Sequence, residues 1–185
     1  MKTFFPAMTV AIGVLFGATL TASGQEIPKA VIAVIDSQHI QRTTLAGKDI
    51  QVQIDALRAK FQDEMQKVEN GLRTEGDELK RQQAILAPEA FQAKGQAYQQ
   101  KVKAAQRLAQ EKRRQLELAL RQAMNQLQHA LIPVLQGIMD KRKITLIVDK
   151  SQVVLQASGL DVTTEVIEEL DRRLPSVKVK LPTAQ

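Results

Sequence analysis

A helix-like apolar pattern runs through residues 48–141 and is broken decisively only at Ala87–Pro88. Apolar residues recur at intervals of three, four or seven, from Ile50 to Leu79 and again from Phe91 to Ile138, which is typical of a stripe on a long helix. Proline disfavours a continuing helix but suits the first turn of a new one. We therefore predict two helices that reverse near residues 86–88 and pack as an antiparallel hairpin. At 1.5 Å per residue they would measure about 58 Å and about 80 Å.

Short β-branched segments flank this helical region. Ala30–Asp36 and Ile144–Asp149 are continuous apolar runs that end in Asp, and we interpret both as buried strands. Asp36 or Ser37 can cap a helix that follows the first strand. We expect Val153–Ser158 to form a third strand, joined to the second in a hairpin.

These elements predict an α+β protein in which the helical hairpin is inserted between the strands of one small β module. A last amphipathic helix follows Asp161 and ends at Pro175. The predicted organisation is a signal peptide at 1–24, a β-rich body formed by 25–47 and 142–175, a hairpin arm at 48–141, and a tail at 176–185.

The β module is too small to be stable alone. Three strands and one helix bury little apolar surface, and the sheet edges would be exposed. We therefore expect several copies to assemble by closing their strands against one another. The predicted interface consists of apolar residues of the strands: Val31, Val34, Ile35, Ile144, Leu146, Ile147 and Val148.

The N-terminus has the pattern of an export signal. Lys2 is followed by an apolar run at Val10–Leu20, which is too short for a transmembrane helix. The small residues Ala22 and Gly24 match the needs of a signal peptidase and predict cleavage that leaves Gln25 first. The chain contains no cysteine, so disulfides are not used. A bacterial periplasm fits this combination best.

Positive charge is concentrated on the second predicted helix. Seven basic residues lie between positions 101 and 121, opposed only by Glu111 and Glu117. They form the candidate binding face: Lys101, Lys103, Arg107, Lys112, Arg113, Arg114 and Arg121. Such a run is either a solvated helix face or a surface that attracts anionic partners, such as acidic unfolded chains or lipid phosphates. Nucleic acid is not expected, because the chain carries an export signal and no aromatic platform accompanies the basic residues.

No catalytic or cofactor motif is recognisable in the sequence. The Ala46–Asp49 segment, "AGKD", lacks the first glycine and the Ser/Thr of a phosphate-binding loop. His39 and His129 are far apart and lack carboxylates at ligand spacing, so we expect no metal site. Asp36 and Asp149 both end strands, where capping is a commoner role than that of an acid pair. We predict no enzymatic activity and no cofactor.

The combination of motifs resembles the Skp (OmpH-like) periplasmic chaperones. The similarity rests on "IAVID" at Ile32–Asp36, on the long Gln-, Lys- and Arg-rich hairpin, and on "ITLIVDKSQVVLQASGLDVTTEVIEEL" at Ile144–Leu170. The resemblance implies a homotrimer in which three β modules form a barrel-like body and the helical arms surround a cavity. It also implies that unfolded outer-membrane β-barrel proteins are held there without ATP, which prevents their aggregation in the periplasm. Anionic lipid or lipopolysaccharide remains open as a further partner.

A structural or adaptor coiled coil of the cell envelope is the alternative. Such adaptors usually present a sharper heptad seam and carry larger β domains beside the hairpin. The weak seam in the alanine-rich middle of the second helix and the single small β module favour the chaperone.

Overall fold

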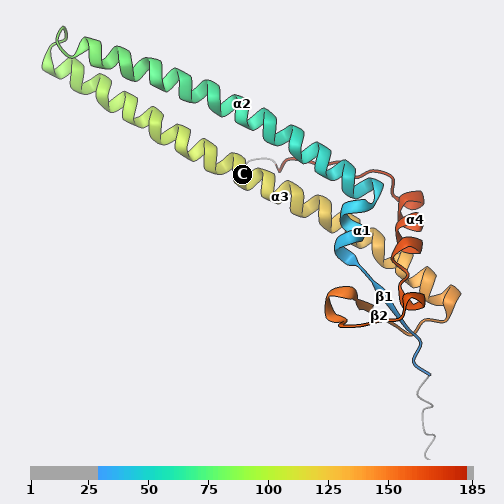
Figure 1. Ribbon diagram of the computed structural model, residues 1–185. Helices are drawn as coiled ribbons and strands as arrows, with labels where there is room; N and C mark the ends of the chain where they lie inside the picture. Colours follow the sequence, from blue (N-terminus) through green and yellow to red (C-terminus); the bar gives the residue numbers. More distant parts are fainter. Residues whose placement is uncertain (1–28, 183–185) are drawn as a thin grey trace, which may run out of the picture.

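The structure, a computed structural model, describes residues 29–182. A long two-helix arm projects from a small body at one end of the molecule (Figure 1). The expected signal peptide at residues 1–24 and its cleavage point lie outside the described residues. Within the part of the chain that is described, no helix combines the length and the apolar character needed to span a membrane.

The arm consists of α2 (Leu45–Gln82) and α3 (Pro88–Arg142), which lie side by side in opposite directions (Figure 1). As predicted, the proline is the first residue of α3, and residues 83–87 make the reversal. α3 continues through Pro133, and Lys143 ends it in the left-handed conformation with φ 57°. At 1.5 Å per residue, the 55 residues of α3 extend about 82 Å.

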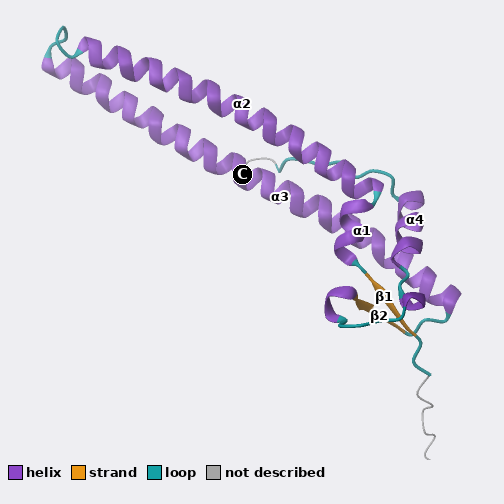
Figure 2. Cartoon of the chain, in the orientation of Figure 1, coloured by secondary structure: helices purple, strands orange, loops and turns teal. Residues whose placement is uncertain are grey.

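Two parallel strands form the centre of the body. β1 (Ile32–Ile35) and β2 (Leu146–Asp149) are hydrogen-bonded neighbours, which confirms that the arm is inserted between them. α1 (Ser37–Thr43) follows β1, and α4 (Thr163–Arg173) packs beside the end of the arm (Figure 2). Parallel strands need a long crossover connection, and here the whole arm is that connection.

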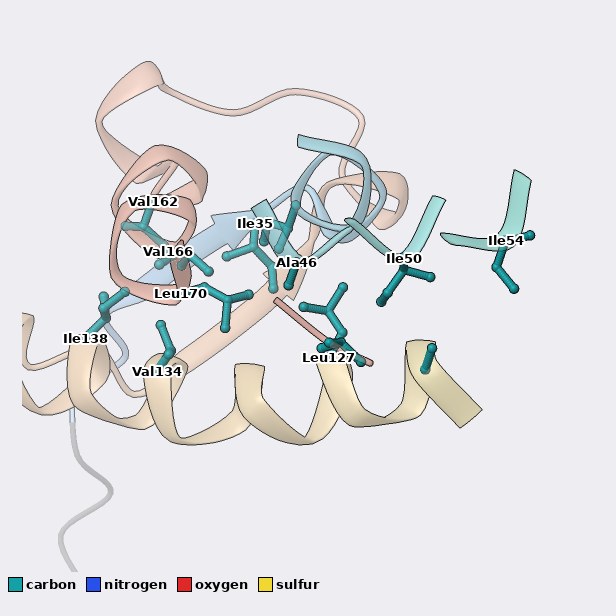
Figure 3. Packing of buried hydrophobic residues seen from close by; sticks show 14 of the residues in the cluster. Ile35, Ala46, Ile50, Ile54, Leu127, Val134, Ile138, Val162, Val166 and Leu170 are labelled. Carbon is teal, nitrogen blue, oxygen red and sulfur yellow. The ribbon is translucent and has the colours of Figure 1, made fainter. Parts of the chain in front are cut away.

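The hydrophobic core lies where the arm meets the body. Val134 and Ile138 of α3 lie next to Val166 and Leu170 of α4, and all four are buried (Figure 3). Burial decreases along the arm. Phe61 is the last buried residue of α2, and the residues from there to the C-terminal end of the helix are half-buried or exposed. The outer half of the arm is therefore held together by half-buried contacts.

The prediction of a third strand at Val153–Ser158 is wrong. After β2 the chain makes two short 3-10 turns, η1 (Lys150–Gln152) and η2 (Ser158–Leu160). The hairpin does not form because Asp149 accepts a hydrogen bond from the Ser151 N–H and starts a helical turn where a reversal was expected. Val154 and Leu155 are left 103 % and 91 % exposed.

The predicted tail at residues 176–185 contacts the arm in its described part. Residues 176–182, which we call the C-terminal strap, pack along the first turns of α2 (Figure 1). Val177 is buried, and the Gln53 side chain hydrogen-bonds the strap backbone. A stretch this short carries little signal of its own, because its place is set by the surface on which it lies.

The two strand ends meet at one carboxylate. Strand register aligns Ile35 with Asp149, which brings Ser37 close to Asp149. Asp149 accepts hydrogen bonds from the N–H and hydroxyl groups of both Ser151 and Ser37. Hydrogen bonds from these donors stabilise the charged carboxylate and hold the pKa of Asp149 well below its ordinary value. The hydroxyl of Ser151 makes the largest contribution. Asp36 instead caps α1, so the two Asp residues act as separate caps.

We expect Asp149→Asn to lower the free energy of unfolding by about 2 kcal/mol at pH 7, because hydrogen bonds to charged groups contribute about 1.5–3 kcal/mol. The folded pKa is depressed, so this contribution is present above the unfolded pKa of about 3.9 and is lost as the pH falls through the lower folded value. Urea unfolding should therefore show a smaller difference between wild type and variant at pH 2 than at pH 7. Asp140→Asn, at an exposed position of α3, is the matched control. Equal losses in both variants would contradict the assigned role of Asp149.

Candidate functional site

The structure separates the seven predicted basic residues, because they lie on different faces of α3. Lys101 and Lys112 face α2 and form ion pairs across the arm. Lys101 Nζ lies 2.7 Å from a carboxylate oxygen of Glu75, and Lys112 Nζ lies 2.8 Å from one of Glu64. These two lysines therefore connect the two helices of the arm.

Lys112 makes the more enclosed of the two contacts. Its side chain is 24 % exposed, and its ammonium group lies 4.4 Å from the centre of the Phe61 ring. This distance is within the range of a cation–π interaction. The hydrogen bond from Lys112 is the main cause that lowers the pKa of Glu64. Lys112 thus serves as a packing residue of the arm, a role that neither interpretation of the basic run had anticipated.

Four of the remaining basic residues share the opposite face of α3. Their spacings of four, seven and seven residues place them within an arc of about 40° at 100° per residue. All four are exposed to solvent. We call this set the outward basic face: Lys103, Arg107, Arg114 and Arg121. Glu117 lies beside it, between Arg114 and Arg121, so the face keeps a net positive charge.

An open groove of about 400 Å³ lies between α2 and α3, near the middle of the arm. Its lining includes the apolar side chains of Phe61, Met65 and Leu116, with Arg58 and Arg113 among the polar residues. Ala109 also lines it, and its small side chain leaves space between the helices. Sequence periodicity treats such positions as core, so the groove was not predicted. We call this feature the arm groove.

A second apolar surface lies on the body, beside the strands. Val31, Ile32 and Leu146 are between 41 % and 49 % exposed, and the adjoining loop carries the exposed Val154 and Leu155. Together these five residues form what we call the body edge. Exposed apolar groups at the edge of a small sheet are a typical surface for association.

The seven residues predicted for a subunit interface differ in accessibility. Val34, Ile35 and Ile144 are buried within this one chain, so their side chains already pack in its own core. Ile147 and Val148 are half-buried. Val31 and Leu146 are exposed and belong to the body edge. The role of all seven residues in a subunit interface stays a prediction.

Metal-binding geometry is also absent from the described chain. Within residues 29–182, the His, Asp and Glu side chains form no group that could hold a metal ion.

Comparisons with known proteins agree with this architecture. A family model described as "Outer membrane protein (OmpH-like)" matches residues 31–170. The crystal structure of a candidate outer membrane chaperone (OmpH-like) from Caulobacter crescentus CB15 superimposes with a TM-score of 0.80 at 20 % sequence identity, covering 89 % of this chain and 98 % of that one. Comparison with curated protein sequences finds no match. Because the family model spans most of the sequence, the protein belongs to the OmpH-like outer membrane protein family.

Proposed function

We propose that this protein is an ATP-independent holdase chaperone of the periplasm. It binds unfolded outer-membrane β-barrel proteins against its helical arms and keeps them from aggregating on their way to the outer membrane. Family membership and the fold shared with the Caulobacter protein, a candidate outer membrane chaperone, support this proposal.

The observation that carries the proposal is the surface of the arm. The arm has an open, largely apolar groove between its helices and a separate exposed basic face. Apolar side chains of an unfolded chain would bind in the arm groove. Acidic groups of the same chain would be attracted to the outward basic face at longer range.

Such contacts are suited to a client that must remain unfolded. Each is weak, and several weak contacts on one assembly bind tightly together without imposing one structure on the client. The outer half of the arm, which has only half-buried packing contacts, can adjust to different client segments.

Assembly completes the proposed cavity. We propose a homotrimer in which the body edges of three copies cover one another. Val154 and Leu155 would be costly to leave in water at 103 % and 91 % exposure, because burying such side chains contributes about 1.5–3 kcal/mol each. Three arms attached to one body would then surround a client.

We expect the purified protein to keep an unfolded, acidic outer-membrane protein soluble after dilution from urea, without any nucleotide. Light scattering measures this effect. Changing the four residues of the outward basic face together to Gln should slow client capture about tenfold at low salt and flatten the salt dependence of the rate, since steering by charge acts mainly on association. Stopped-flow fluorescence at two salt concentrations measures both quantities.

The matched control removes one inward lysine through the change Lys101→Gln. This residue contacts α2 and lies outside the lining of the arm groove, so the control should speed amide exchange in the arm while largely keeping the salt dependence of capture. Equal capture rates for wild type and both variants would remove the outward basic face from the mechanism. Aggregation that proceeds equally with and without the protein would overturn the chaperone proposal and favour an adaptor coiled coil.

Assembly through the body edge can be tested by placing charge there. The double change Val154→Asp and Leu155→Asp places two charges on the body edge and should convert a trimer into monomers at micromolar concentration, because buried charges are strongly unfavourable. Val52→Asp, at an apolar arm position that is 67 % exposed, is the control and should leave the trimer intact. Sedimentation velocity distinguishes the species. A wild-type protein that sediments as a monomer would rule out the proposed assembly.

A further inference from the structure

The C-terminal strap has the side-chain pattern of an extended strand. Val177 is buried, Val179 is half-buried, and the intervening Lys178 and Lys180 are exposed. Apolar and basic side chains therefore alternate along the strap, with the apolar ones turned toward α2. The strap lies beyond residue 170, where the family match ends.

Contacts from α2 to the strap are made to its backbone. The Gln53 side-chain amide donates to the Val177 carbonyl at 2.8 Å and accepts from the Val179 N–H at 2.9 Å. Asp49 accepts from the Val177 N–H at 3.3 Å and also from the Gln53 amide at 2.9 Å, which orients that amide. One side chain thus binds both the carbonyl and the N–H groups of an extended segment, much as the edge of a sheet does.

Recognition of this kind depends little on sequence. Backbone groups are the same in every chain, and the side-chain requirement is limited to apolar residues at the positions of Val177 and Val179. Val177 belongs to the same buried cluster as Ile50 and Ile54 of α2, and Val179 packs against that cluster. Removing the strap would therefore expose a small apolar site with backbone-binding groups beside it.

We propose that this site, formed by Asp49, Gln53 and the adjoining apolar surface of α2, is a docking site for extended segments of the unfolded client. The C-terminal strap occupies it in cis and competes with the client. This inference rests on the proposed chaperone function. Membrane-spanning β-strands alternate apolar and polar residues with a period of two, which is also the pattern of the strap.

Competition in cis sets a threshold for binding. A tethered segment acts at an effective concentration in the millimolar range, so a single weak client strand displaces it poorly. A client that already contacts several arms has a comparable local concentration and can replace the strap. The strap would thus keep short peptides out of the site while admitting long unfolded chains.

The test uses a fluorescent peptide with the sequence of the strap, SVKVKLP, and the full-length protein. The double change Val177→Ser and Val179→Ser loosens the strap and should tighten peptide binding about tenfold over wild type, because the tethered competitor is weakened. Adding Gln53→Ala to that variant should abolish the gain. The matched control, Lys178→Ser with Lys180→Ser, changes the exposed positions of the same strap and should bind the peptide like wild type.

Peptide binding that is equal in wild type and in the loosened variant would overturn the proposal. The strap would then only stabilise the first turns of α2. A chain that ends after Pro175 offers a second test if the serine variant is poorly folded, and it should bind the peptide at least as tightly. Client capture is measured separately by light scattering. Peptide binding together with failure to suppress aggregation would overturn the proposed function and, with it, the client as occupant.

Discussion

The pairing of β1 with β2 is the constraint on which the rest of the structure depends. The strands are parallel and separated in sequence by the whole arm, so they can pair only if α2 and α3 return the chain to its starting point. Asp149 stabilises this pairing, because its carboxylate accepts hydrogen bonds from Ser37, just past the end of the other strand. The same register brings Val34 within reach of Asp161, which places the segment before α4. A slip of one residue in the strand register would separate Asp149 from Ser37 and Val34 from Asp161.

Strand pairing fixes only the end of the arm that joins the body. Its buried residues gather near the body, and toward the tip the helices are connected by half-buried apolar contacts and by exposed ion pairs such as Lys101–Glu75. Surface ion pairs of this type contribute about 0–1 kcal/mol. The arm therefore has a rigid base and a compliant outer part, and the proposed client-binding features lie along it.

Elements governed by local chemistry could be predicted from the sequence. Pro88 marks the start of α3, and Asp36 caps α1, because both effects act within one helical turn. The insertion of the arm followed from two similar strand endings placed on either side of one long helical pattern. At Gly76, by contrast, a side chain would lie 2.9 Å from the Tyr98 hydroxyl oxygen. Its packing role depends on which residues of α3 lie opposite, and periodicity does not specify that.

The basic residues of α3 show the same dependence on which side chains lie opposite. A run of basic residues does not reveal which of them contact a neighbouring helix, so Lys112 and Arg114 were grouped although one packs on Phe61 and the other is exposed. The apolar run at Val153–Ser158 has the composition of a strand, yet a strand forms only where a partner with free hydrogen-bonding groups is available. In one chain β1 already pairs with β2, and the Asp149 cap turns the following residues away.

Amide hydrogen exchange with and without an unfolded outer-membrane protein tests most directly the central claim, that the arm surface holds the client. The account predicts slower exchange around the arm groove, at residues 58–65 and 109–116, unchanged exchange in β1, and fast exchange throughout the bound client. Protection confined to the body, or a client whose own amides become protected like those of a folded protein, would contradict it.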